Sequence, residues 1–195
     1  AYDEIDSNYD IEDNAATLLS TTGVDTVVDS GVDTVFVTDS SVDADTGAAL
    51  NDLELSLQDV GGTDIDFTVT DEAGAVASEL SSMTGDELDE ANDVNVVGGT
   101  IDVAAADAVQ DITAYDEIDS NYDIQDSAGA ILTASGEVLD NLGVNNVFAE
   151  NVQLASDVVT LSNDTSVDNY SLDSSFNDIS NLSIPEALAI IDAGN

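Results

Sequence analysis

Aspartate-rich segments carry the clearest chemical capacity in this sequence. Residues 3–10 and their copy at 116–123 offer carboxylate and amide oxygens at alternate positions, and a DxD pair precedes Phe67. Calcium prefers oxygen ligands of this kind. Alternate positions share one face of a strand, so stacked strands would bring carboxylates together and favour a bridging cation. We therefore predict calcium binding by these residues: Asp3, Asp6, Asn8, Asp10, Asp64, Asp66, Asp116, Asp119, Asn121 and Asp123. A solvated acidic loop is the alternative interpretation.

Most catalytic chemistry lacks its key residue. None of the 195 residues is Lys, Arg, His or Cys, whereas 43 are Asp or Glu. A Ser-His-Asp triad, a reactive thiolate and a Schiff base are therefore excluded. The tripeptide Asp45-Thr46-Gly47 resembles an aspartic-protease signature, but no second DTG exists to complete a dyad. We interpret it as a polar turn before a helix and expect no enzymatic activity. A fragment of a halophilic enzyme is a remaining alternative.

The net charge of −43 limits the partners of the chain. Nucleic acids and anionic membrane surfaces both attract basic residues, so neither is expected as a partner. The sequence has no run of about 18 apolar residues, so membrane insertion is not expected. Hydrophobic residues make up 43% of the chain, which favours a folded protein over a disordered acidic tail. Repulsion among the carboxylates then has to be screened by salt or neutralised by cations.

An internal duplication organises the chain. Residues 1–11 recur unchanged at 114–124, an offset of 113. This defines a first repeat unit at 1–113, with half-repeats at about 1–58 and 59–113, and a second, incomplete unit at 114–195. In each half-repeat alternating apolar residues lead to an Asp and then an Ala-rich turn, which predicts a strand followed by a helix with the Asp as its N-cap. The predicted caps are Asp13, Asp71 and Asp126.

A second kind of unit lies between these copies. Val-rich strands are expected at 34–42, 100–103 and 144–152, followed by Ala-rich helical stretches at 44–53, 104–112 and 153–159. Strands that alternate with short helices at a fixed interval favour a parallel sheet. We predict an α/β repeat solenoid with short parallel strands and short Ala-rich helices. Two tandem globular domains are the alternative.

The repeated motifs YDIEDNAATLL, FTVTDEAGAVASEL and YDIQDSAGAIL resemble repeat arrays of large acidic secreted bacterial surface proteins. These families include S-layer-like proteins, RTX-type adhesins and extracellular filament proteins. The resemblance implies export and frequent calcium dependence. The glycine-rich nonapeptide calcium repeat of RTX proteins is absent from this chain, so its calcium ligands cannot be transferred to any residue here.

The expected function is that of an extracellular or cell-surface structural protein. Stacked repeats would assemble head to tail into a filament, surface layer or matrix, with calcium as a bridging ion. Residues 1–11 and 184–195 would then form the junction between copies. A calcium-dependent adhesin or ligand-binding module is the alternative function. A surface glycan is a further expected partner. Three N-glycosylation sequons begin at Asn163, Asn169 and Asn181, and their chance occurrence in a chain rich in Ser, Thr and Asn is the alternative to glycan attachment there.

Overall fold

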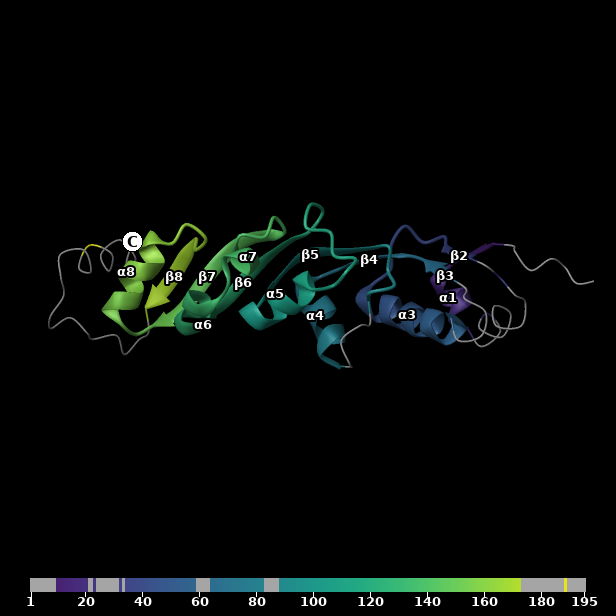
Figure 1. Ribbon diagram of the computed structural model, residues 1–195, viewed down its shortest axis with the longest axis horizontal. Helices are drawn as coiled ribbons and strands as arrows, with labels where there is room; N and C mark the ends of the chain where they lie inside the picture. The colour runs from purple at the N-terminus through teal and green to yellow at the C-terminus, as the bar shows by residue number, and fades with distance from the viewer. Residues whose placement is uncertain are drawn as a thin grey trace, which may run out of the picture.

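The elements follow one another in chain order along an elongated molecule (Figure 1). The computed structural model describes residues 10–20, 23, 32, 34–58, 64–82, 88–172 and 188. The strands are β1 (Ile11–Asp13), β2 (Thr34–Val37), β3 (Asp64–Asp66), β4 (Thr68–Asp71), β5 (Asp93–Ile101), β6 (Asn121–Ser127), β7 (Val144–Val152) and β8 (Asn169–Leu172). The helices are α1 (Ala15–Leu18), α3 (Ala44–Gln58), α4 (Ala73–Ser82), α5 (Val103–Gln110), α6 (Ala128–Thr133), α7 (Gly136–Leu139) and α8 (Ala155–Asn163).

The described strand pairs are all parallel, and neighbouring strands are also neighbours in sequence. One sheet has the order β1-β2-β3 and the other the order β4-β5-β6-β7-β8. Only Phe67 separates β3 from β4, and an isolated bridge joins Val42 to Val69 at this point. The predicted α/β alternation with parallel pairing is therefore confirmed. We call a strand, or the β3–β4 pair, together with the helix or helices that follow it a unit.

The strands bury one face and expose the other. In β6, Tyr122 and Ile124 are buried whereas Asn121 and Gln125 are exposed, which is the alternation expected of a strand with one covered face. The parallel register places like positions side by side, as in a buried row across three strands formed by Ile101, Ile124 and Val147.

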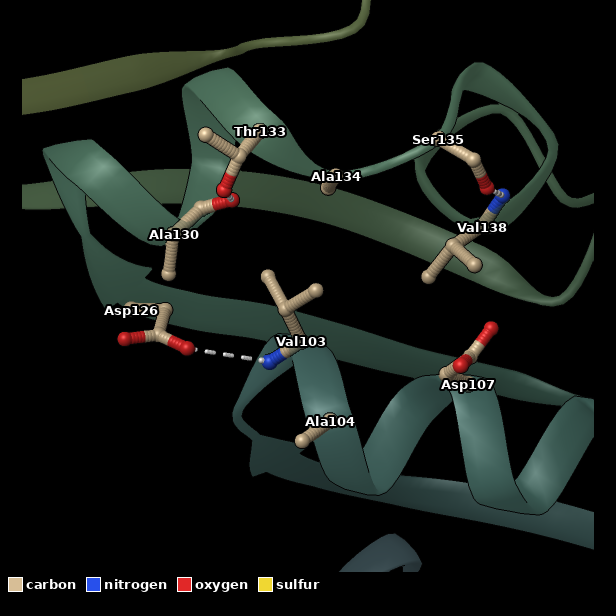
Figure 2. Close-up of a pocket in the computed structure, with 9 residues that line it drawn as sticks. All are labelled: Val103, Ala104, Asp107, Asp126, Ala130, Thr133, Ala134, Ser135 and Val138. Carbon is tan, nitrogen blue, oxygen red and sulfur yellow. Dashed lines mark hydrogen bonds between the residues drawn. The ribbon is translucent and has the colours of Figure 1, made fainter.

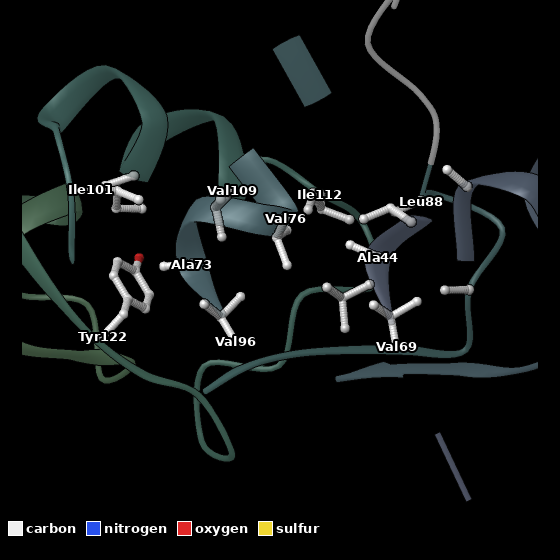
Figure 3. Packing of buried hydrophobic residues seen from close by; sticks show 14 of the residues in the cluster. Ala44, Val69, Ala73, Val76, Leu88, Val96, Ile101, Val109, Ile112 and Tyr122 are labelled. Carbon is white, nitrogen blue, oxygen red and sulfur yellow. The ribbon is translucent and has the colours of Figure 1, made fainter. Parts of the chain in front are cut away.

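Helices form the second layer over the buried face. Contacts join α3 to α4, α4 to α5, α5 to α7 and α6 to α8, so the helices run beside one another along the sheet. The core between the two layers is built from Val, Ile, Leu and Ala and continues from unit to unit (Figure 3). No unit could bury its apolar face alone, because each face is covered partly by its neighbours.

The largest fully buried side chain, Tyr122, carries a polar group into this core. Its hydroxyl accepts a hydrogen bond from Gln110 Nε2 at 2.7 Å, and the same amide donates to the carbonyl oxygen of Val138 at 3.1 Å. Burial raises the pKa of Tyr122, against the lowering effect of the Gln110 hydrogen bond. The ring therefore links β6 to α5 and α7 without leaving its hydroxyl unpaired.

The predicted helix caps were wrong by one residue. Asn14 is the N-cap of α1 and Ser127 is the N-cap of α6, and each side-chain oxygen accepts a backbone N–H three residues further on. Asp13 and Asp126 stand one position earlier. Helix α4 begins at Ala73, two positions after Asp71. The sequence pattern located the helix starts, but it assigned Asp71 and Asp126 to the wrong helices, because their partners Ala44 and Val103 lie in the preceding units.

Candidate functional site

Three aspartate side chains reach from one unit to the helix of the preceding unit. In each pair the carboxylate accepts a hydrogen bond from the first backbone N–H of that helix, a group with no partner inside the helix. A carboxylate is also favoured there by the helix dipole. The pairs are Asp39 Oδ2 with Ala15 N at 2.8 Å, Asp71 Oδ2 with Ala44 N at 3.0 Å, and Asp126 Oδ2 with Val103 N at 3.2 Å.

In Asp71 and Asp126 the second carboxylate oxygen fixes the orientation of the side chain. Asp126 Oδ1 accepts the N–H of Ser127 at 2.6 Å, and Asp71 Oδ1 accepts the N–H of Glu72 at 2.8 Å. Figure 2 shows Asp126 beside the first turn of α5, at a cavity of about 350 Å³ lined by α5, β6, α6 and α7. Asp71 and Asp126 thus join their own strand ends to the neighbouring units.

Asp13 has the same local geometry with one difference. Its Oδ1 accepts the backbone N–H of Asn14 at 2.8 Å and the Asn14 side-chain amide at 3.0 Å. Within residues 10–20 and the other described ranges, no donor to Asp13 Oδ2 is found. In sequence Asp13 is the copy of Asp126, 113 residues earlier. The oxygen that in Asp126 caps a neighbouring helix is therefore unused by the described part of the chain.

In two units the strand has a bulge near its end, where the units of Asp39, Asp71 and Asp126 have an aspartate. In β5 the register shifts between Val97 and Thr100, where Gly98 and Gly99 have φ of 80° and 86°. A Cβ on Gly99 would lie 3.3 Å from the first N–H nitrogen of α4, so both the conformation and the close approach favour glycine. In β7 a similar shift occurs at Asn151, whose φ is 55°. Adjacent units therefore meet in two ways, through an aspartate that contacts the preceding helix or through a bulged strand end.

The first group of predicted calcium ligands is only partly described. Asp3, Asp6 and Asn8 lie outside the described residues, and Asp10 is exposed just before β1. Their copies lie in a turn and in β6: Asp116 Oδ1 accepts the N–H groups of Ile118 at 2.8 Å and of Asp119 at 3.3 Å, while Asn121 and Asp123 belong to the strand.

The expected facing of carboxylates on adjacent strands is not found in the described strand pairs. Asp64 and Asp66 of β3 stand in register with Thr34 and Phe36. The neighbours of Asp123 in its row are Thr100 and Asn146. Among the residues that the structure describes, no group of three or more acidic side chains is arranged to hold a metal ion.

Side-chain amides of Asn and Gln donate hydrogen bonds to carboxylates at positions where a Lys or Arg would form a salt bridge in another protein. Asn146 Nδ2 donates to Asp123 Oδ1 at 2.7 Å, and Gln125 Nε2 donates to Glu150 Oε1 at 2.5 Å. Two further pairs are Asn92 Nδ2 with Asp66 Oδ1 at 3.1 Å and Asn141 Nδ2 with Glu117 Oε2 at 3.4 Å. These amide–carboxylate pairs were not predicted from the sequence. The available signal was an Asn or Gln spaced 23 to 26 residues from an acidic residue.

Asp93 is a described carboxylate whose surroundings disfavour its ionised form. Burial raises its pKa most, and the nearby charge of Asp116 raises it further; a hydrogen bond from Asn95 opposes both, and Asp119 adds a smaller repulsion. By contrast, hydrogen bonds from Thr46, first from its side chain and then from its backbone, lower the pKa of Asp43 at the start of α3.

A polar groove crosses the exposed face of the sheet over β5 to β8. It has a volume of about 420 Å³ and combines amide, carboxylate and hydroxyl groups with one aromatic ring. Its outward-facing lining residues are Thr100, Asp123, Gln125, Asn146, Phe148 and Asn169.

Comparison with protein families finds no match for this chain, and neither does comparison with curated proteins or with solved structures. None of the described helices has the length and apolar character needed to cross a bilayer. Any assignment of function therefore depends on the geometry given above.

Proposed function

We propose that this chain is an extracellular structural protein, a solenoid of stacked units that assembles head to tail into a filament, surface layer or matrix. The observation that carries the proposal is the oxygen of Asp13 for which the described residues supply no donor. Ile11 and Asp13 of β1 repeat Ile124 and Asp126 of β6. In β6 the same positions are covered by the preceding unit, which supplies a paired strand and a helix N–H.

We infer that the outer edge of β1 offers these contacts to another molecule. Among the described strands, β1 pairs with β2 alone. At β6, the equivalent backbone edge pairs with β5, and the equivalent oxygen of Asp126 accepts the first N–H of α5. The edge of β1 and Asp13 Oδ2 can make the same two contacts with another molecule. A second copy of this chain is the matched occupant, because its units consist of the same kind of parallel strand and following helix. A head-to-tail contact of this type builds an open filament when the rotation does not close.

Charge determines the conditions for such assembly. No Lys, Arg or His exists to form an ion pair across the junction, so strand pairing and the carboxylate-to-helix contact must hold it. Two chains of charge −43 repel each other unless salt screens them. Calcium stays part of the proposal as an ion that bridges or screens the acidic segments, and catalysis has no part in it.

Sedimentation of Asp13→Ala against wild type at matched salt tests the proposal. Loss of a carboxylate cap costs about 1 kcal/mol, which corresponds to an association constant about fivefold lower. Asp107→Ala is the matched control, since it removes the same charge from an exposed position on α5, away from β1. A wild-type chain that stays monomeric at every concentration, with and without calcium, would overturn the proposal. Equal weakening by both variants would show that charge alone, and not the cap, controls association.

A further inference from the structure

The polar groove over β5 to β8 is built as two rows of outward side chains. The register sets Thr100, Asp123 and Asn146 in one row. The second row contains Gln125, Phe148 and Asn169. Neighbouring side chains within a row are about 4.8 Å apart, and the rows are separated by about 6.7 Å along the strands. The groove therefore presents a regular grid of polar groups around one aromatic ring.

Neighbouring groups hold several of these side chains in place and leave an atom free for a ligand. Asp123 Oδ1 is occupied by Asn146 Nδ2, so Oδ2 remains. Gln125 Nε2 is occupied by Glu150, so Oε1 remains. Asn169 Oδ1 accepts the N–H of Tyr170 at 2.8 Å, which leaves its Nδ2 as a donor. Because these orientations are fixed in the free protein, a ligand loses less entropy on binding.

The charge of the groove selects against anions. Asp123 and Asp168 both line it, and the chain contains no basic side chain to offset them. Phosphorylated, sulfated or carboxylated ligands would be repelled. The remaining acceptors outnumber the donors, which suits a ligand that carries many hydroxyl groups. Phe148 is only half-buried on this otherwise polar face, and its ring supplies a flat apolar surface.

We propose that this groove binds an uncharged saccharide, with Asp123, Asn146 and Asn169 hydrogen-bonding its hydroxyl groups and Phe148 packing against the C–H face of the sugar ring. This inference is independent of self-assembly, because the groove lies on the sheet face and not at the edge of β1.

The test begins with an immobilised array of neutral oligosaccharides of glucose, galactose, mannose and N-acetylglucosamine, followed by saturation-transfer NMR on each sugar retained. Phe148→Leu keeps an apolar side chain but removes the ring, and we expect roughly tenfold weaker binding. Phe36→Leu is the matched control, since Phe36 is an exposed ring on β2 outside the groove, and its affinity should be unchanged. Thermal melts of both variants confirm that they are folded.

A second readout needs no substitution. In wild type, the side-chain amide signals of Asn146 and Asn169 should shift on titration with the retained sugar. The proposal fails if no neutral saccharide binds at millimolar concentration, or if both Phe variants bind as wild type does. It also fails if calcium alone shifts these amide signals and no sugar does, because the groove would then be a cation site.

Discussion

Asp126 accepts hydrogen bonds from two units at once, so this single residue connects a strand end to a helix in the preceding unit. Asp126→Ala removes both bonds, and we expect a loss of about 1 to 2 kcal/mol in the free energy of unfolding. Urea denaturation measures it. Asp107→Ala, an exposed position on the helix that Asp126 caps, should stay within about 0.5 kcal/mol of wild type. Equal effects of the two substitutions would contradict the role of Asp126 as a link.

Asn146 shows how single residues replace the missing cations. Asn146→Asp would put a second carboxylate beside Asp123 and remove the amide donor. We expect a stability loss of about 1 kcal/mol at low salt, reduced at high salt because the repulsion is screened. Asn145→Asp adds the same charge at the adjacent exposed position. Thermal melts of the two variants across a NaCl series compare them directly, and identical curves would refute the pairing.

The two perturbed carboxylates should respond to pH in opposite directions. Asp93 has a raised pKa, so the native state holds its proton more tightly than the unfolded chain. Its ionised form therefore destabilises the fold at pH values above the raised pKa. This penalty disappears below pH 3.8, the ordinary pKa of an aspartate. Asp93→Asn should raise the melting temperature at neutral pH and have little effect below 3.8, as thermal melts at both pH values would show.

Asp43→Asn provides the opposite sign. The lowered pKa of Asp43 contributes stability above pH 3.8, the ordinary pKa of an aspartate. This contribution is lost as the pH falls through the lower pKa of the native state. The substitution should therefore lower the melting temperature at neutral pH. If both variants shifted the melting temperature in the same direction, general charge repulsion would explain the pH dependence better than these local contacts.

At the scale of elements, the sequence predicted the alternation well. The Val-rich segment 144–152 became β7 over its full length, and the Ala-rich stretch from 104 became α5 with a start one residue earlier. Alternating apolar residues report directly which face of a strand is buried, and Tyr122 and Ile124 followed that pattern. The alternation of strand and helix therefore followed from local pattern, but the strand expected at 100–103 is only the end of β5, and Val103 begins α5.

Contacts between elements were harder to predict because they depend on the register. Asn146 lies 23 residues from Asp123, whereas Asn92 lies 26 residues from Asp66. Loop lengths differ from unit to unit, so no fixed offset in the sequence identifies which polar residues face each other. The same difficulty explains the aspartate caps: a local pattern assigns Asp126 to the nearest helix, and only the paired strands show that Val103 is its partner.

The loop before β7 has a steric requirement that tests the packing of adjacent units. A Cβ on Gly143 would overlap the hydroxyl of Tyr115, which donates to Asn141 Oδ1 at 3.0 Å. Gly143→Ala should lose about 1 to 3 kcal/mol in denaturant unfolding, and adding Tyr115→Phe should restore part of it by removing the clashing oxygen. Gly129→Ala on α6 has open space and should be neutral or stabilising. Failure of the double variant to recover would place the strain elsewhere.

At the scale of the whole molecule, repulsion among 43 acidic residues opposes every contact described above. The melting temperature should rise with NaCl concentration, most steeply up to about 0.1 M, where the Debye length falls to about 10 Å. Calcium at equal ionic strength should raise it further if the acidic segments bridge through the ion. A melting temperature independent of salt would contradict the view that screening permits this fold.

We propose that the stacking of units continues from one copy to the next through the edge of β1. Cryo-electron microscopy of the concentrated chain in screening salt tests it most directly. We expect filaments with a repeat of about 4.8 Å along their axis, the spacing of paired strands, in which β1 of one copy lies parallel to the last unit of another. Single particles at all concentrations, or filaments joined through any surface that leaves β1 unpaired, would contradict the account.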